Sequence, residues 1–258
     1  MGDSGTNPGM KSICATVPNK YPGQFVLCST TADGTKSIFT PMDKQLEEFT
    51  TEIRSHPELA KGFDAVGLSQ GNYLIEAYIS LVNDPPVKNF VSICGPLEGE
   101  ASCPENIAFD LICPIWKLDP YGANLAFSGY WKNTKDQAGF KTKSKLLADV
   151  LNARDTKNAT VAENWKNLEN LVLIEAEKDT MIVPKESAQF GMWKWGTSGK
   201  DAPIVPMNQS EGYQGDWMGL KTLDEAGKIH MSSFDGEHIR FTSEYWDSTV
   251  LPYLGDTW

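Results

Sequence analysis

Histidine and positive charge are scarce in this sequence. Only three histidines and 23 Lys or Arg occur in 258 residues, against 34 Asp or Glu, and the net charge is −11. A surface of that sign repels phosphate backbones, so nucleic acid is not an expected partner. No apolar run reaches the roughly 18 residues that a membrane-spanning helix needs, so stable membrane insertion is not expected either.

Cysteine pairs of the metal-binding kind are absent. The five cysteines are Cys14, Cys28, Cys94, Cys103 and Cys113, and no two of them form a CxxC pair. With so few histidines, this spacing predicts no metal site. The odd number leaves at least one thiol free if the others pair.

The start of the chain lacks the features of a signal peptide. The segment "MGDSGTNPGMKSIC" has neither a basic n-region nor an apolar h-region, and it begins without a strand. Either the protein starts in this way or an upstream part is missing. Two sequons, at Asn158 and Asn208, would be glycosylation acceptors in a secreted protein.

Strand and helix patterns alternate along the first 94 residues. Buried strands are predicted at 23–30, 63–68 and 88–94, and amphipathic helices at 42–53 and 72–82. The first of these helices is expected to have Thr40 as its N-cap and Pro41 as its first residue. This alternation predicts an α/β fold, with a mostly parallel sheet covered by helices on both faces.

The pattern loosens over residues 97–165, where aromatic and helical stretches occur without a strong strand. We interpret this segment as a helical insertion over the sheet, within a single domain of residues 1–258. Strands return at 168–179 and 227–236. A C-terminal helix is expected over 242–254, capped by Thr242 or Ser243.

The stretch "FDAVGLSQGNYLIEAYI" places G-x-S-x-G between a buried strand and a helix. This is the nucleophile-elbow pattern, in which a tight, strained turn exposes the serine above the sheet edge. Ser69 is therefore the candidate nucleophile, and the backbone N–H of Gln70 is a candidate oxyanion donor. The glycines on either side, Gly67 and Gly71, would avoid clashes with strand and helix. The alternative is an ordinary strand-to-helix turn with a capping serine.

A serine nucleophile needs a histidine base, and in this fold the base follows the serine in the chain. His56 precedes Ser69 and suits a cation at a helix C-terminus better. His230 lies inside a predicted strand, where a core or solvated histidine is expected. His238 follows that strand in a loop, which is where such folds place the base.

The orienting acid should come after a strand, between the serine and the histidine. Asp179 meets this requirement, because it follows the strand "LVLIEAE". Glu175 and Glu177 lie on the strand itself and are expected at the surface or the sheet edge. Asp235 and Glu237 are too close to His238 in sequence and are interpreted as loop polar residues.

The flanking segments resemble the palmitoyl-protein thioesterase family of lysosomal α/β hydrolases over nearly the whole chain. Similar stretches are "MGDSGTNPGM", "GFDAVGLSQGNYLIEAYI", "NDPPVKNFVSICGPLEG", "LIEAEKDTMIVPKESAQFGMW", "YQGDWMGLKTLDEAGKI" and "FDGEHIRFTSEYWDSTVLPYLG". The resemblance implies an α/β-hydrolase fold and a lysosomal or secretory location. In the family, a hydrophobic strand ending in His-Gly precedes the residue that matches Met1. That strand is absent here, so we expect the first core strand to be missing and the sequence to be incomplete.

The resemblance also implies roles for individual residues. Ser69 would be the nucleophile, Asp179 the acid and His238 the base. The oxyanion hole would use the backbone N–H groups of Gln70 and Met1. Cys103 and Cys113 would form a disulfide, with two reduced buried cysteines as the alternative.

The expected reaction is hydrolysis of long-chain acyl thioesters on protein cysteines through an acyl-enzyme, with S-palmitoylated proteins as substrates and without a metal or cofactor. An apolar wall for the acyl chain is expected in the insertion. Its candidate residues are Phe109, Leu111, Ile112, Ile115 and Trp116, which could equally be ordinary core. The alternatives are a general carboxylesterase or lipase, and an inactive acyl-binding homologue if the chain truly starts at Met1.

Overall fold

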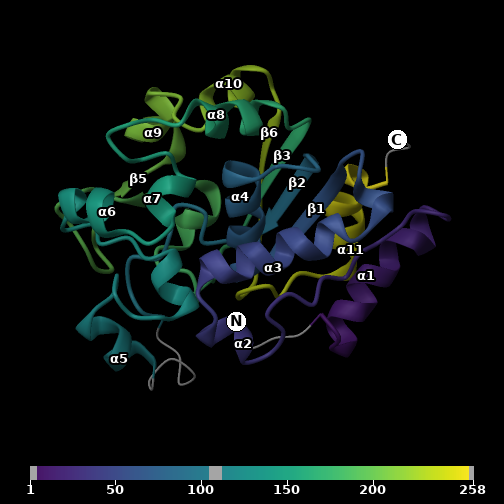
Figure 1. Cartoon of the computed structure of the whole chain (residues 1–258), viewed down its shortest axis with the longest axis horizontal. Coiled ribbons are helices and arrows are strands. Elements are labelled where there is room, and N and C mark those ends of the chain that lie inside the picture. The colour runs from purple at the N-terminus through teal and green to yellow at the C-terminus, as the bar shows by residue number, and fades with distance from the viewer. Residues whose placement is uncertain (1–4, 105–111, 256–258) are drawn as a thin grey trace.

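The computed structural model describes residues 5–104 and 112–255, and a four-stranded parallel sheet lies at its centre (Figure 1). The strand order is β1-β2-β3-β6, and every neighbouring pair is parallel. The strands are β1 (Phe63–Leu68), β2 (Val87–Ile93), β3 (Asn170–Ala176) and β6 (Ile229–Phe234). Four of the five predicted strands are confirmed: β1 has the predicted bounds, and the other three differ at their ends by one to three residues.

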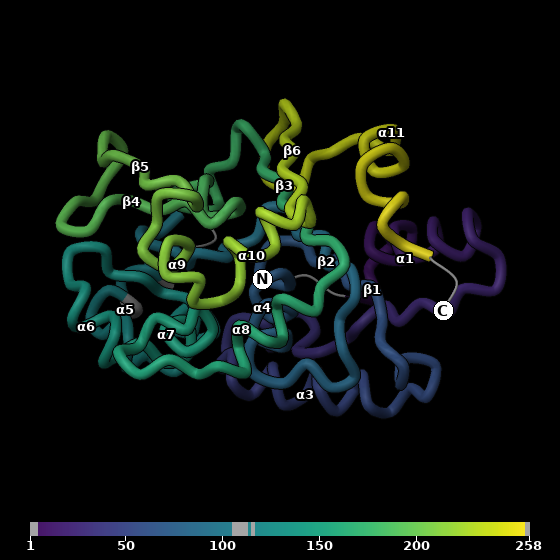
Figure 2. The backbone as a smooth tube through the Cα atoms, turned by 90° about the horizontal axis from the view of Figure 1, so that it is seen from above, coloured from purple at the N-terminus to yellow at the C-terminus, as the bar shows by residue number. Residues whose placement is uncertain are grey.

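The sheet separates two hydrophobic cores, because side chains alternate between its faces along each strand. Phe90, Leu171 and Leu173 belong to the larger core, while the neighbouring Val91 and Val172 belong to the other. The larger core is covered by α3 (Met42–Arg54), α4 (Gln70–Leu81) and α8 (Ala159–Lys166). The second core is covered by α1 (Pro8–Lys20) and by the C-terminal helical turns that begin with α11 (Ser243–Tyr245). Figure 2 shows α1 and α11 side by side, away from the insertion.

The described part of the segment after β2 contains several short helices. It contains α5 (Ile112–Leu118), α6 (Gln137–Lys143), α7 (Leu147–Val150) and a 3-10 turn at Ala126–Gly129, and it lies on one side of the sheet in Figure 1. The remaining elements are α2 (Lys36–Phe39), β4 (Met192–Trp193), β5 (Ile204–Val205), α9 (Glu211–Gln214), α10 (Leu220–Glu225), and short turns at Pro57–Leu59, Lys185–Gln189, Met207–Gln209, Trp246–Val250 and Leu251–Tyr253. The antiparallel pair of β4 and β5 was not predicted. None of the described helices combines the length and apolarity needed to cross a bilayer.

The prediction of a strand at residues 23–30 is wrong, because residues 24–30 have no regular structure. A strand forms only where a neighbour can pair its N–H and C=O groups. Here β1 is the edge strand of the described sheet, and a cavity of about 560 Å³ has both β1 and residues 24–29 among its walls. Within residues 5–104 and 112–255, no strand therefore lies beside residues 24–30 to pair with them.

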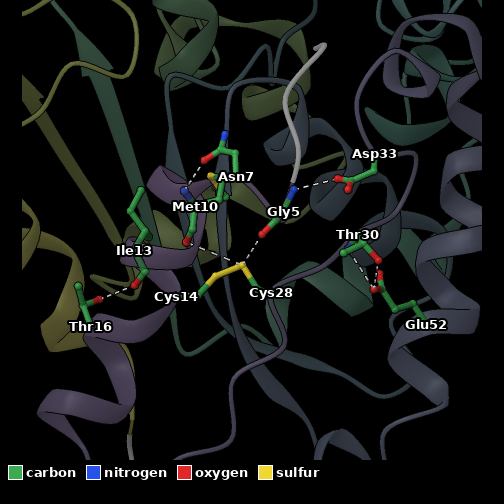
Figure 3. Close-up of a disulfide and its surroundings, with 10 residues drawn as sticks. All are labelled: Gly5, Asn7, Met10, Ile13, Cys14, Thr16, Cys28, Thr30, Asp33 and Glu52. Atoms are coloured by element: carbon green, nitrogen blue, oxygen red, sulfur yellow. Dashed lines mark hydrogen bonds between the residues drawn. A yellow bond between two sulfur atoms is a disulfide. The ribbon is translucent and has the colours of Figure 1, made fainter.

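Helix α1 was not predicted, although its start carries a recognisable signal. Asn7 is the N-cap, its side chain accepts a hydrogen bond of 2.8 Å from the Met10 N–H, and Pro8 is the first helical residue. Figure 3 shows Cys14 of this helix joined to Cys28 by a disulfide that was also not predicted.

The predicted capping of α3 is shifted by one residue. Pro41, not Thr40, is the N-cap, and the helix begins at Met42. Its apolar face is as predicted, since Met42, Leu46 and Phe49 are buried. At the other end of the chain, Thr242 caps α11, because its side chain accepts from the Tyr245 N–H.

Candidate active site

Ser69 lies in a strained turn between β1 and α4. Its φ is +53°, a left-handed value that non-glycine residues rarely adopt. The buried amide of Asn72 holds the turn, donating 2.7 Å to the Ile93 carbonyl and 3.1 Å to the Ser69 carbonyl. The elbow is thus fixed to the neighbouring strand β2. Sequence analysis did not identify this role of Asn72.

The two glycines of the elbow have different surroundings. A Cβ at Gly67 would lie 2.7 Å from the Asn72 Cα, and a Cβ at Gly95, which follows β2, would lie 2.5 Å from the Asn72 Cβ. These positions allow strand and helix to approach closely. A Cβ at Gly71, by contrast, would have no described residue outside its own helix within 4 Å, so the prediction that Gly71 avoids a clash is wrong.

The structure brings Ser69, His238 and Asp179 together at the carboxyl edge of the sheet. The Ser69 Oγ is 2.9 Å from the His238 Nε2, and the His238 Nδ1 is 2.7 Å from the Asp179 Oδ2. The other carboxylate oxygen of Asp179 accepts from the N–H groups of Met181, at 2.8 Å, and Ile182, at 3.1 Å. Nucleophile, base and acid could therefore act in series, with the acid fixed by its own loop.

Gln70 is the first residue of α4, and the first N–H groups of a helix have no acceptor within the helix. Its backbone N–H is thus available beside Ser69. The side chain is anchored, since its Nε2 donates 2.9 Å to the Ser37 carbonyl and its Oε1 accepts 3.0 Å from the Tyr130 hydroxyl. The predicted second oxyanion donor, Met1, lies outside the described residues.

The other histidines and acids considered from sequence lie elsewhere. The His56 ring packs against Phe25 in a tilted arrangement, with 5.3 Å between ring centroids, and the His230 Nε2 contacts the Asn170 Oδ1 at 2.9 Å. These two rings have contacts that do not involve Ser69. The acids Glu175 and Asp235 form ion pairs with Lys185 and Lys178, and Glu177 is exposed.

Ser69 and His238 open into the same 560 Å³ cavity that borders β1. Phe127 and Tyr130 of the segment 97–165 line this cavity, and so does Ile182 of the loop that contains Asp179. Of the predicted acyl wall, Phe109 and Leu111 lie outside the described residues, as do the side chains of Ile112, Ile115 and Trp116.

Three buried acidic or thiol groups were not identified as important from sequence. Burial raises the pKa of Glu76 well above its ordinary value, and neither carboxylate oxygen has a hydrogen-bond partner among the described residues. Burial likewise raises the pKa of Glu100, although the Val183 N–H opposes it with a hydrogen bond of 2.9 Å. Burial raises the pKa of the Cys94 thiol to about 12. The Cys94 thiol is therefore protonated near neutral pH.

The remaining site predictions concern covalent modification. Cys103 and Cys113 are joined by a disulfide, which agrees with the pairing that the resemblance implied. Cys94 is the free thiol that the odd cysteine count required. Asn158 and Asn208 are both exposed, so their side chains are accessible.

Comparison of this sequence with known proteins shows the family to which the chain belongs. The family described as palmitoyl protein thioesterase matches residues 1–238. Palmitoyl-protein thioesterase 3 of Dictyostelium discoideum is 32% identical, over 95% of this chain and 87% of its own length. Palmitoyl-protein thioesterase 1 of Caenorhabditis elegans is 33% identical, over 93% of this chain and 84% of its own length. The chain belongs to the palmitoyl-protein thioesterase family.

More distant members of the palmitoyl-protein thioesterase family also match. The human lysosomal thioesterase PPT2 is 27% identical, over 91% of this chain and 79% of its own length. Family membership agrees with the α/β-hydrolase fold that the elbow and the parallel sheet indicate.

Proposed function

We propose that this chain is a serine hydrolase that cleaves long-chain fatty acyl thioesters from protein cysteines. The observation that carries the proposal is the hydrogen-bonded series Ser69–His238–Asp179 in a family whose relatives are named palmitoyl-protein thioesterases. The two lines of support are independent, since one is geometric and the other rests on sequence similarity.

In the first step, Ser69 Oγ attacks the thioester carbonyl while His238 Nε2 takes its proton. The developing oxyanion accepts a hydrogen bond from the Gln70 N–H. Asp179 keeps the His238 tautomer in which Nδ1 carries the proton, and it stabilises the imidazolium. The C–S bond then breaks, and the imidazolium returns its proton to the departing cysteine thiolate.

In the second step, His238 takes a proton from water, and the resulting hydroxide attacks the acyl-Ser69 carbonyl. Collapse of the second oxyanion breaks the C–O bond and returns the proton to Ser69. The products are a free fatty acid and serine in its original state. We include Met1 as the second oxyanion donor, as the family resemblance implies.

The acyl chain needs an apolar site next to Ser69, and we propose that residues 97–165 supply it within a single domain. In support, Phe127 and Tyr130 of this segment line the cavity that contains Ser69. The backbone edge of β1 lines the same cavity, and its polar groups suit a neighbouring strand better than a hydrocarbon chain. We therefore place the acyl chain along the insertion and not along β1.

A lysosomal or secretory location is part of the proposal. Relatives from human and Drosophila melanogaster are named lysosomal thioesterases. Two disulfides and two exposed sequons also suit an oxidising, glycosylating route. Occupied sugars at Asn158 and Asn208 would be detected by mass spectrometry after expression in a secreting host.

The deciding experiment compares hydrolysis of a palmitoyl-cysteine peptide with that of its palmitoyl-serine analogue, with Ser69→Ala as the control. The proposal expects turnover that favours the thioester and requires Ser69. Equal turnover of both substrates would favour a general esterase. A folded sample that binds the peptide without turnover, and whose Ser69 does not react with a fluorophosphonate, would favour an acyl-binding homologue.

A further inference from the structure

Glu100 lies in the segment after β2, and its carboxyl contacts the loop that contains Asp179. The residue is only 1% exposed, and it lines the cavity that contains Ser69. Its Oε2 accepts a hydrogen bond of 2.9 Å from the Val183 N–H. The backbone adds a second contact, since the Ala101 N–H donates 2.8 Å to the Val183 carbonyl. Val183 is therefore held through both of its backbone polar groups.

Three successive N–H groups of this loop donate to two carboxylates. Those of Met181 and Ile182 donate to the Asp179 Oδ1, and that of Val183 donates to Glu100. Residues 179–184 belong to no helix or strand, so their N–H groups need acceptors of another kind. Loss of the Glu100 carboxyl would therefore loosen the loop directly beside Asp179.

The backbone of Glu100 is itself fixed by the segment 97–165. Its N–H donates 2.8 Å to the Tyr130 carbonyl, and its carbonyl accepts 2.7 Å from the Lys132 N–H. The Tyr130 hydroxyl in turn donates 3.0 Å to the Oε1 of Gln70, the residue after Ser69. None of these bonds uses the Glu100 side chain. A substitution at 100 can therefore remove the contact with the acid loop and leave the backbone bonds in place.

We propose that Glu100 is a positioning residue that fixes the acid loop and, through it, the orientation of Asp179 toward His238. The proposal rests on the proposed function. The Asp179 Oδ2 must stay 2.7 Å from the His238 Nδ1 to hold the imidazole in its reactive tautomer and orientation. A small displacement of the acid is enough to slow the reaction. The role requires an acceptor oxygen at 100 and does not require a charge.

The test measures kcat and KM for a palmitoyl-cysteine peptide in the full chain, as wild type and as Glu100→Leu, Glu100→Ala and Glu100→Gln. Leu and Ala both lack the acceptor, and Leu fills space that Ala leaves empty. Both should lower kcat by about 10- to 100-fold, with a smaller change in KM. Gln keeps an acceptor oxygen and should restore a kcat close to that of wild type.

Two controls separate positioning from general destabilisation. Glu76→Leu removes another fully buried carboxyl, one without a hydrogen-bond partner among the described residues, and should change stability but not kcat. In an Asp179→Asn background, Glu100→Leu should cost little further activity, because both changes act on the same contact. A full additional loss there, a wild-type kcat in Glu100→Leu, or an equal loss in Glu100→Gln would overturn the proposal.

Amide hydrogen exchange gives a readout that does not depend on activity. The Val183 N–H should exchange about tenfold faster in Glu100→Leu than in wild type, and Glu100→Gln should restore the slow rate. Equal rates in wild type and Glu100→Leu would overturn the proposal. If wild type shows no turnover, the proposed function fails, but the exchange rates still decide whether Glu100 holds the acid loop.

Discussion

Ser69 and His238 are 169 residues apart in the chain, yet the serine oxygen and the histidine nitrogen are 2.9 Å apart. Ser69 follows β1 and His238 comes after β6, the two outer strands of the described sheet. Parallel strands have their carboxyl ends at one edge, so the loops that follow them can converge there.

The contact between Asp179 and His238 predicts a large loss of activity for Asp179→Asn. The amide would favour the wrong imidazole tautomer, and we expect kcat to fall by about 10⁴-fold. Steady-state hydrolysis of a palmitoyl-cysteine peptide measures this. Glu175→Gln is the matched control, because Glu175 lies on β3 and pairs with Lys185. This variant should keep near-normal kcat. A similar loss in both variants would contradict the assignment of Asp179.

The elbow glycines predict opposite effects of one substitution. Gly67→Ala should lower stability by about 2 kcal/mol, because the new Cβ meets the Asn72 backbone 2.7 Å away. Gly71→Ala should be neutral or should stabilise by up to about 1 kcal/mol, since it adds a helix-favouring residue facing open space. Urea unfolding measures both. A Gly67→Ala protein as stable as Gly71→Ala would show that the close approach at Asn72 is wrong.

The Cys14–Cys28 disulfide joins α1 to the irregular segment 24–30, which has no sheet partner. Closing a loop of 14 residues restricts the unfolded chain, so the double variant Cys14→Ala/Cys28→Ala should lose about 3 kcal/mol of stability. Unfolding in guanidinium under non-reducing conditions measures the loss, with Cys94→Ala as a cysteine variant that keeps both bridges. An unchanged midpoint in the double variant would mean that the bridge does not form.

Buried Glu76 predicts a stability that falls as pH rises. Burial raises the folded-state pKa of Glu76 above its ordinary 4.5, and the nearby charge of Glu98 raises it further. The stability it contributes is therefore fully present below pH 4.5 and is lost as pH rises toward the folded-state pKa, at up to about 1.4 kcal/mol per unit.

Urea unfolding of wild type and Glu76→Gln from pH 4.5 to 8 tests this. Wild type should lose stability more steeply with pH than the variant, whose amide does not titrate. Buried Glu100 is present in both proteins, so its own contribution cancels. Parallel pH profiles would show that Glu76 is solvated or paired.

Much of the site could be predicted from sequence because local patterns encode it. The elbow is recognisable from a predicted strand, a serine between two glycines and a predicted helix. The expected fold then gives the chain order of serine, acid and base. Ser69, Asp179 and His238 follow from these two facts. The strand at 23–30 failed because its apolar pattern specifies burial but does not supply a pairing partner.

Other features are decided only by tertiary structure. Asn72 is an unremarkable helix residue in sequence, and its role depends on reaching the Ile93 carbonyl of another strand. Cys94 lies 85 residues before Asp179 and 144 before His238, and spacing gives no sign that the three groups meet. Periodicity and turn chemistry act over a few neighbours, so the sequence by itself determined the four strands of the parallel sheet and the elbow at Ser69. Contacts between strand ends form only after the sheet has assembled, so the tertiary structure decided what surrounds each of these residues.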